Sequence, residues 1–290
     1  MKKSMNTVFI GADARSAFAA EYLDLAGHEV GYCKCQCRMP ASAVRIESIG
    51  DALGFADAVV LPIPVTRDGK ELLYSEGVLL SQIAENLPFD KKMLFFGGMI
   101  PDFWQEELES LGVKTVDYSK NEQYLQNSAE LTARAFLDFL NDKDLPSLEN
   151  SKVAICGLGR IGKCLTRHLG RLNAQINVLS GRADALRESY PRNISFFDYR
   201  DACDALSDRD AVINTAPSHV LGMVAVKSLP KKATFYELAS SPFGIEKSCA
   251  KYLGDRYVKA LGLPGIYYPK ESGELIAKSV LSALDEEVMR

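Results

Sequence analysis

The segment Ser151–Gly162 constrains the fold of this chain more than any other. It reads SKVAICGLGRIG, a short apolar run that ends in three glycines, Gly157, Gly159 and Gly162. An amphipathic run follows at once, so the predicted order is strand, tight turn and helix, as in a dinucleotide-binding unit. In such a unit the first glycine permits the turn, the second leaves room for a pyrophosphate, and the third lets the helix pack close to the strand.

The residues around this glycine loop support a nucleotide site. A second strand is predicted at Gln175–Leu179, and the start of the predicted helix offers unpaired N–H groups and a positive dipole end to phosphates. The alternative is a glycine turn that binds nothing, which a lone motif would not exclude. The residues expected to hold the pyrophosphate are Gly157, Leu158, Gly159, Arg160, Ile161 and Gly162.

The type of nicotinamide coenzyme is predicted from the end of the second strand. Ser180-Gly181-Arg182 stands where NAD sites usually carry Asp or Glu for the ribose hydroxyl. A hydroxyl and an Arg suit a 2′-phosphate instead. Ser180 and Arg182 therefore favour NADP over NAD, with a solvated Arg182 at the next helix start as the alternative.

Two later strands complete the expected coenzyme site. Ala211–Asn214 and Ala233–Leu238 are apolar runs, and their carboxyl ends should lie at the edge of a parallel sheet where ligands bind. Thr215, Ala216 and Pro217, which follow the first of these strands, are expected to flank the nicotinamide ribose. Tyr257–Leu263 is predicted as one further strand.

The first part of the chain also alternates strand and helix signals, which predicts βαβ units and a parallel sheet. The predicted strands are Thr7–Ile10, Glu29–Tyr32, Ala58–Leu61, Met93–Phe96 and Val113–Asp117. The turn after the first strand carries Asp13 and Arg15, which do not suit a pyrophosphate. An Arg near a helix start instead suits a carboxylate, and the alternative is an Arg15 that is paired with Asp13.

A long helix, Asn121–Leu140, is predicted between the two parts, and a polar stretch closed by Pro146 follows it. The expected fold is α/β, with two Rossmann-like, doubly wound parallel-sheet domains joined by this helix and a C-terminal helix that packs back towards the first domain. The predicted boundaries are 1–120 for a flavodoxin-like or Rossmann-like substrate domain, 121–145 for the connector, 146–270 for the coenzyme domain and 271–290 for the last helix.

Composition excludes several classes of protein. The net charge is −4 and the pI is near 5.6, which gives no indication of nucleic-acid or anionic-membrane binding. No apolar run approaches the ~20 residues that cross a bilayer, and no signal peptide is apparent, so we expect a cytoplasmic protein.

Cys33, Cys35 and Cys37 would share one face of an extended chain, but no fourth ligand lies nearby, and no metal site is predicted.

Several motifs together resemble one family, the A subunit of dipicolinate synthase from spore-forming bacteria. They occur in the family's order and span nearly the whole chain, and the last of them is the most distinctive. The matching stretches are GADAR at 11–15, GLGRIG at 157–162, INTAPS at 213–218, LASSP at 238–242 and GLPGIYYPKESG at 262–273.

This resemblance implies an NADP-linked oxidoreductase that converts dihydrodipicolinate into dipicolinate during sporulation, together with a B subunit. A substrate with two carboxylates needs fixed cations, and Arg15 and Lys270 supply them in the cleft expected between the domains. Ser218 is expected to contact a substrate carboxylate, and Asp13 and Lys270 are candidate proton acceptors. We expect a homo-oligomer.

Two alternatives remain open from the sequence. The chain could be a nucleotide-binding subunit that supports a partner carrying FMN, on which the redox step takes place. It could also be an NAD(P)-dependent dehydrogenase of another small acid, although the Arg–Glu–His set of one such class is not found in the sequence.

Overall fold

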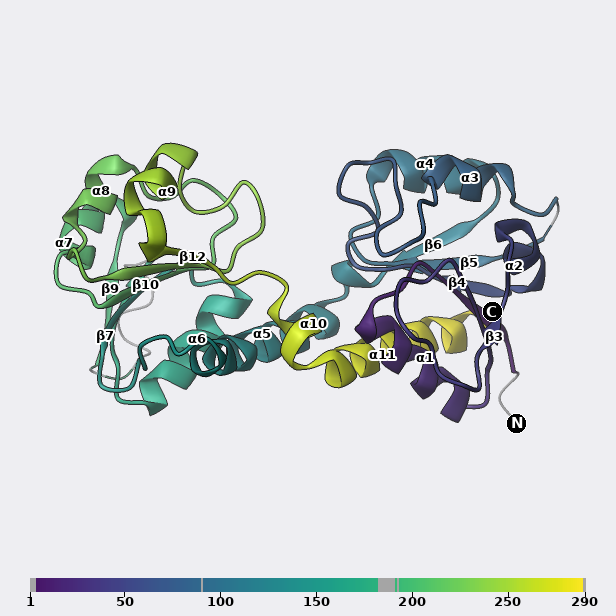
Figure 1. Ribbon diagram of the computed structural model, residues 1–290, viewed down its shortest axis with the longest axis horizontal. Helices are drawn as coiled ribbons and strands as arrows, with labels where there is room; N and C mark the ends of the chain where they lie inside the picture. The colour runs from purple at the N-terminus through teal and green to yellow at the C-terminus, as the bar shows by residue number, and fades with distance from the viewer. Residues whose placement is uncertain (1–3, 90, 182–190, 192, 289–290) are drawn as a thin grey trace. The chain divides into compact units, whose positions relative to one another are not determined.

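The chain forms two compact α/β units in a computed structural model that describes residues 4–89, 91–181, 191 and 193–288 (Figure 1). The first unit comprises Met1–Ser128 and Tyr268–Arg290, and the second comprises Ala129–Tyr267. Each unit is built on one sheet, and every strand pair in both sheets is parallel.

The first unit has the strand order β3-β2-β1-β4-β5-β6. The order reverses between β1 and β4, where Thr7 pairs with Val30 on one side and Ala58 on the other. This reversal is the switch point at which open α/β sheets bind ligands. The strands are β1 (Asn6–Ile10), β2 (Glu29–Cys33), β3 (Val44–Arg45), β4 (Ala58–Val60), β5 (Leu94–Gly97) and β6 (Lys114–Asp117).

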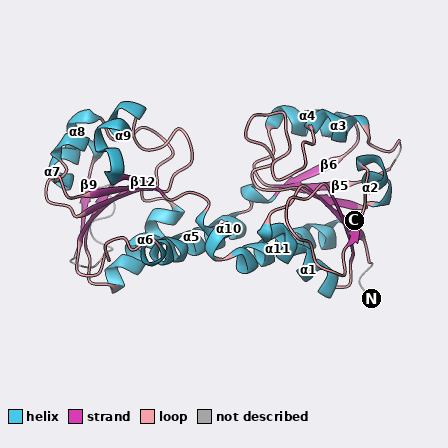
Figure 2. Ribbon diagram, viewed as in Figure 1, coloured by secondary structure: helices cyan, strands magenta, loops and turns pink. Residues whose placement is uncertain are grey.

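Helices cover both faces of the first sheet because its strands are apolar on both sides. Val8 and Ile10 face one core, with α2, α3 and α4 against it, while Phe9 faces the other core, formed with α1 and α11. Figure 2 shows these two helical layers on opposite sides of the strands. The helices are α1 (Ala14–Leu25), α2 (Ile49–Phe55), α3 (Leu80–Glu85), α4 (Asp102–Ser110), the short η1 (Tyr118–Lys120) and α11 (Pro269–Val288).

The second unit repeats this arrangement, with the strand order β12-β11-β10-β7-β8-β9. Its order reverses between β7 and β10, so the glycine loop after β7 lies at the switch point. The strands are β7 (Lys152–Cys156), β8 (Gln175–Leu179), β9 (Ile194–Phe197), β10 (Ala211–Asn214), β11 (Thr234–Glu237) and β12 (Tyr257–Lys259).

Two helical layers also enclose the second sheet (Figure 1). One face packs against α7, α8 and α9 through residues such as Val212 and Phe235. On the other face, Phe136 of α5 lies edge-on to Tyr236, with ring centroids 5.3 Å apart. The helices are α5 (Glu122–Asp142), α6 (Arg160–Arg171), α7 (Ala202–Leu206), α8 (Met223–Ser228), α9 (Lys247–Leu253) and α10 (Leu263–Tyr267), with the short η3 (Tyr199–Asp201) and η4 (Gly254–Arg256).

The predicted fold class is confirmed. Both units are doubly wound parallel sheets, α5 crosses from the first unit into the second at residues 128 and 129, and α11 packs along α1 in the first unit. The division between the two compact units falls inside α5, between Ser128 and Ala129. The sequence analysis treats residues 121–145 as a connector. The domain boundaries proposed there stay a prediction.

The strand predicted at Tyr257–Leu263 is wrong in its second half. The strand ends at Lys259, and Leu263 begins the helix α10. Gly262 has φ +66°, a left-handed conformation that ends an extended segment.

Candidate functional site

The glycine loop has the geometry that its sequence predicts. Gly157 has φ +96°, and a Cβ there would lie 2.8 Å from Thr215 Oγ1. A Cβ on Gly162 would lie 2.1 Å from the carbonyl oxygen of Gly157, so the loop and α6 can approach this closely only with glycine. Gly159 is exposed, and a Cβ there would meet no atom within 4 Å. The loop is therefore tight at its first and third glycines and open at its second.

The start of α6 faces this open position. Gly159 is the N-cap of the helix and, having no side chain, cannot form a side-chain capping hydrogen bond. The first backbone hydrogen bond of the helix runs from Lys163 N to Gly159 O. The N–H groups of Arg160, Ile161 and Gly162 precede that bond and lie at the positive end of the helix dipole, an arrangement that suits an anion.

Thr215 connects β10 to the loop. Its Oγ1 lies 3.0 Å from the carbonyl oxygen of Cys156 and 3.2 Å from that of Gly157, and it can donate to either. Thr215 and Ala216 are partly buried, whereas Pro217 and Ser218 are exposed just beyond them.

The residues expected to select NADP are only partly described. Ser180 is partly buried, directly follows β8 and donates its backbone N–H to the carbonyl oxygen of Phe197 at 3.0 Å. It therefore stands at the same sheet edge as the glycine loop. Arg182 lies outside the described residues.

Glu237, the last residue of β11, is a buried carboxyl at this edge that the sequence did not single out as a site residue. It is 0% exposed and accepts hydrogen bonds from Asn214 Nδ2, the N–H groups of Ala239 and Gly244, and the hydroxyl of Tyr257. The available signal was a single charged residue inside the apolar run Ala233–Leu238, because an acidic residue is almost never fully buried without partners.

The first unit places Asp13 and Arg15 at its own switch point. Asp13 caps α1 by accepting from the N–H groups of Arg15 and Ser16. The Arg15 guanidinium donates to Asp13 Oδ2 from Nε at 2.8 Å and from Nη2 at 2.6 Å, and Nη2 also donates to the carbonyl oxygen of Ile63 after β4 at 2.7 Å. The pair with Asp13 is thus present, and among the described residues no hydrogen bond involves Arg15 Nη1.

This ion pair is mostly removed from water. The side chains of Arg15 and Asp13 are 15% and 19% exposed. Burial would lower the pKa of Arg15, but the hydrogen bond and charge of Asp13 more than offset it, so the pKa is raised. Tyr118 and Tyr124 lie near the guanidinium, and burial raises the pKa of Tyr124 to about 12. The site is thus a fixed cation beside two neutral phenols.

Lys270 lies in the first turn of α11 in this same unit and is exposed, without an ion pair among the residues the structure describes. Three residues on, a Cβ on Gly273 would lie 2.5 Å from the carbonyl oxygen of Arg15, so the starts of α11 and α1 are in contact. Arg15, Asp13 and Lys270 therefore belong to one unit, whereas Ser218 belongs to the other.

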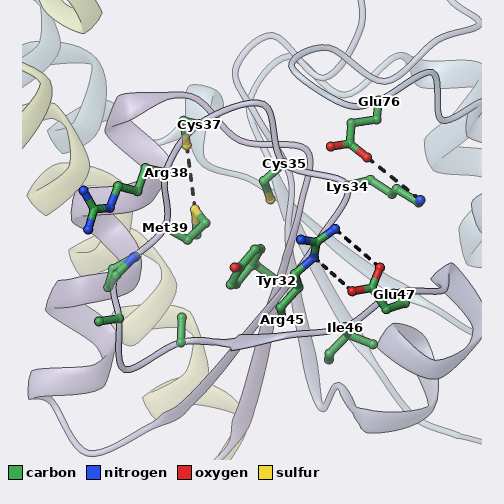
Figure 3. A pocket seen from close by; sticks show the side chains of 13 residues that line it. Tyr32, Lys34, Cys35, Cys37, Arg38, Met39, Arg45, Ile46, Glu47 and Glu76 are labelled. Carbon is green, nitrogen blue, oxygen red and sulfur yellow. Dashed lines mark hydrogen bonds and ion pairs between the residues drawn. The ribbon is translucent and has the colours of Figure 1, made fainter.

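A cavity of the first unit lies beyond the ends of β2 and β3 and has a volume of about 370 Å³ (Figure 3). Cys35, Cys37 and Met39 line it, with Cys37 Sγ 3.7 Å from Met39 Sδ. Burial raises the pKa of Cys37 to about 11, so the thiol is protonated at neutral pH.

The three alternating cysteines do not share one face, contrary to expectation. Cys33 belongs to the core beneath α2, while Cys35 and Cys37 pack against the opposite core. The reason is Lys34, whose φ of +54° interrupts the extended chain. Over residues 4–89, 91–181, 191 and 193–288, no three His, Cys, Asp or Glu side chains are placed to hold a metal ion. None of the helices in these same ranges is long and apolar enough to cross a membrane.

Comparison with known proteins bears first on the first unit. Residues 6–119 match the family model of the N-terminal domain of the dipicolinate synthase A subunit. A curated relative, the A subunit of dipicolinate synthase from Bacillus subtilis (strain 168), is 32% identical over 142 residues, which cover 49% of this chain and 48% of the relative. The matched segment thus spans about half the length of that relative.

Solved structures extend the likeness in fold to almost the whole chain. The dipicolinate synthase A subunit from Bacillus halodurans has a TM-score of 0.83 at 22% identity, with 98% of this chain and 99% of that chain covered. The A chain of dipicolinate synthase from Bacillus subtilis has a TM-score of 0.81 at 23% identity, with 99% of each chain covered.

A third solved structure is more distant. NAD-dependent formate dehydrogenase from Staphylococcus aureus, in complex with NAD, has a TM-score of 0.55 at 13% identity, with 98% of this chain and 96% of that chain covered. This chain therefore shares its fold with a dehydrogenase as well as with the dipicolinate synthase A subunits. The resemblance of this chain to the dipicolinate synthase A subunit is confirmed: residues 6–119 match the model of its N-terminal domain, and the fold matches over almost the whole chain.

Proposed function

We propose that this chain catalyses the NADP-linked oxidation of dihydrodipicolinate to dipicolinate as the A subunit of a dipicolinate synthase, together with a B subunit. The observation that carries the proposal is the glycine loop of the second unit. Its first and third glycines pack too tightly for any side chain, and its second is open to solvent beside the start of α6. This combination suits a pyrophosphate.

The second unit would hold the coenzyme through its sheet edge. The backbone N–H groups of Arg160, Ile161 and Gly162 would bind the pyrophosphate, and Ser180 with Arg182 would bind the 2′-phosphate. Thr215, Ala216 and Pro217 would flank the nicotinamide ribose. When bound, the nicotinamide supplies the two-electron acceptor that this oxidation requires.

The first unit would bind the diacid through its cations. Arg15 is held by Asp13 and Ile63, so its planar fork is fixed before a substrate arrives, and Nη1 has two N–H groups to offer a carboxylate. Lys270 would bind the second carboxylate as a mobile point charge. Ser218 is proposed as a further contact, and the proton that leaves as the ring becomes aromatic would go to Asp13, or to Lys270 if that amine is neutral and does not bind a carboxylate.

A second candidate function has support from one observation. Asp13 already accepts four hydrogen bonds from α1 and Arg15, which leaves it poorly suited to accept a proton. A chain without a proton acceptor would act as a nucleotide-binding subunit, with the redox step on an FMN held by the B subunit.

One assay distinguishes these functions. Dihydrodipicolinate is supplied to the chain alone with NADP, to the chain with NADP and the B subunit, and to both subunits with FMN. Dipicolinate formed in either NADP reaction supports the proposed oxidation. Product formed only when FMN is present would overturn it in favour of the nucleotide-binding role.

A further inference from the structure

The Glu237 side chain is buried at the sheet edge where the glycine loop of the second unit lies. It accepts hydrogen bonds from β10, from the loop after β11 and from the start of β12. Asn214 Nδ2 from β10 lies 2.6 Å from Oε1, and the Tyr257 hydroxyl at the start of β12 lies 3.3 Å from Oε2. The N–H groups of Ala239 and Gly244 lie 3.1 and 2.9 Å away. Four donors on two oxygens satisfy a carboxylate, which a buried charge requires.

Asn214 passes this restraint on to the loop after β10. Its Nδ2 donates to the carbonyl oxygen of Ala216 at 3.0 Å, and its Oδ1 accepts from the N–H of the same residue at 3.2 Å. The amide therefore holds both backbone groups of Ala216. Because Nδ2 also donates to Glu237, the carboxylate fixes which way the Asn214 amide faces.

The loop after β11 depends on the same carboxylate. Glu237 binds this loop at both ends, Ala239 and Gly244, and a Cβ on Gly244 would lie 2.3 Å from the Asn214 side chain. The carbonyl oxygen of Gly244 in turn accepts from the N–H groups of Val220 and Leu221. The segments 215–221 and 239–244 are thus joined through one buried group, with Ser218 and Ser240 exposed on them.

We infer that Glu237 is a positioning residue for the nicotinamide half of a bound pyridine dinucleotide, acting through Asn214 on the Ala216 backbone. The inference rests on the proposed coenzyme site, and it concerns the loops beyond β10 and β11 rather than the glycine loop. It assigns Glu237 no contact with the coenzyme and no proton transfer.

The chemistry of Glu237 explains why its amide would not replace it. Burial raises the pKa of the Glu237 carboxyl, and the hydrogen bonds from Asn214, Gly244, Ala239 and Tyr257 oppose that rise. In Glu237→Gln one acceptor oxygen becomes an NH₂ group that points at donors. At least two of the four hydrogen bonds would be lost, while the volume of the side chain stays the same.

The test is a comparison of two ligands by calorimetry on the full chain. One is NADPH or NADH, whichever the wild type binds more tightly, and the other is ADP, which carries the adenosine and the pyrophosphate without nicotinamide. We expect Glu237→Gln to lower the affinity for the dinucleotide about tenfold or more. The affinity for ADP should change less than about twofold. Glu246→Gln, at an exposed carboxylate in the same region, is the control and should change neither.

Asn214→Ala provides a second route to the same result. It leaves three partners on Glu237 but removes both bonds to Ala216, so the same split between dinucleotide and ADP is expected, even if Glu237→Gln does not fold. Equal weakening of both ligands in the variants would show a merely structural role and overturn the inference, as would unchanged binding of both. A wild type that binds none of these ligands would instead refute the proposed coenzyme site, and the inference with it.

Discussion

At the scale of single residues, the two switch points use opposite solutions for a ligand edge. The second unit removes side chains, with glycines at 157, 159 and 162, so that backbone can approach a phosphate. The first unit fills the equivalent turn with Asp13 and Arg15, a partly buried ion pair. The pair excludes a pyrophosphate and presents a guanidinium, so the two edges are suited to different ligands.

Arg15→Lys should weaken binding of the diacid substrate although it keeps the positive charge. An ammonium cannot bind Asp13, Ile63 and a carboxylate in one plane as the guanidinium can. We expect kcat/KM for dihydrodipicolinate to fall about tenfold or more, which corresponds to at least ~1.4 kcal/mol of transition-state binding. Steady-state kinetics measures it, with the exposed Arg67→Lys as the control. Unchanged kinetics in a folded Arg15→Lys variant would remove Arg15 from the substrate site.

Two glycines of α6 offer a matched pair for the phosphate site. Gly162→Ala forces a methyl group against the Gly157 carbonyl, 2.1 Å away, while Gly170→Ala meets nothing within 4 Å. We expect the first to lower the free energy of unfolding by about 1–3 kcal/mol and to weaken NADP binding. The second should stabilise the chain by up to ~1 kcal/mol. Urea unfolding and calorimetry check both, and equal effects of the two would contradict the packing argument.

At the scale of elements, the two sheets are held at their amino-terminal edge by the same arrangement. Asp57 before β4 accepts from Asn6 N at 3.0 Å, and Asp210 before β10 accepts from Lys152 N at 3.0 Å. The backbone of each Asp also forms hydrogen bonds with the two neighbouring strands. The N–H of Asp57 donates to β1 and its carbonyl oxygen accepts from β5. The N–H of Asp210 donates to β7 and its carbonyl oxygen accepts from β11. Each aspartate therefore connects three strands where the central pair begins.

The stability of the second unit should depend on pH through Asp210. The hydrogen bond from the Lys152 N–H, with Lys232 nearby, holds the pKa of Asp210 below its usual value. A lowered folded pKa stabilises the protein above the unfolded pKa, and this stability is lost as the pH falls through the folded pKa. Asp210→Asn should therefore be less stable than wild type at pH 7.

Urea unfolding at pH 7 and in acid measures this effect. The difference between wild type and Asp210→Asn should shrink as the pH falls, because Asp210 is then protonated in both the folded and the unfolded wild type. The exposed Asp255→Asn is the control. A difference that stays constant with pH would show that the charge of Asp210 contributes nothing.

The sequence predicts those elements whose signal is local. Gln175–Leu179 and Ala211–Asn214 are mainly apolar runs in which only Gln175 is exposed, and they are strands with those same bounds. Val44–Arg45 is a two-residue edge strand with both residues exposed, so no apolar run marks it. The predicted shared face of the cysteines fails because nothing in the residue type of Lys34 indicates a positive φ.

At the scale of the whole molecule, the site was predictable where a motif specifies the backbone and not where it depends on contacts distant in sequence. The glycine loop combines turn, helix start and close packing within twelve residues, so its sequence is sufficient. Glu237 acquires its environment from Asn214, Gly244 and Tyr257, which belong to β10, to the loop after β11 and to β12. No local pattern specifies such a contact.

Coenzyme binding should protect the second unit selectively. Because the proposed contacts lie beyond β7, β8 and β10, NADP should slow amide hydrogen exchange in segments 153–165 and 211–221. Exchange in β1 and β4 of the first unit should change little without substrate. Hydrogen exchange read by mass spectrometry checks this, and protection confined to the first unit would mean that the coenzyme binds elsewhere.

The central claim is that a pyridine dinucleotide lies with its pyrophosphate over Gly159. Calorimetric titration of NADP and NAD tests it most directly, with Gly159→Asp to put a carboxylate at the open position and Gly222→Asp, also in open space, as the control. We predict that wild type and Gly222→Asp bind at least one of the two coenzymes and that Gly159→Asp binds neither. No heat of binding with folded wild type, or equal affinity in the Gly159→Asp variant, would contradict this claim.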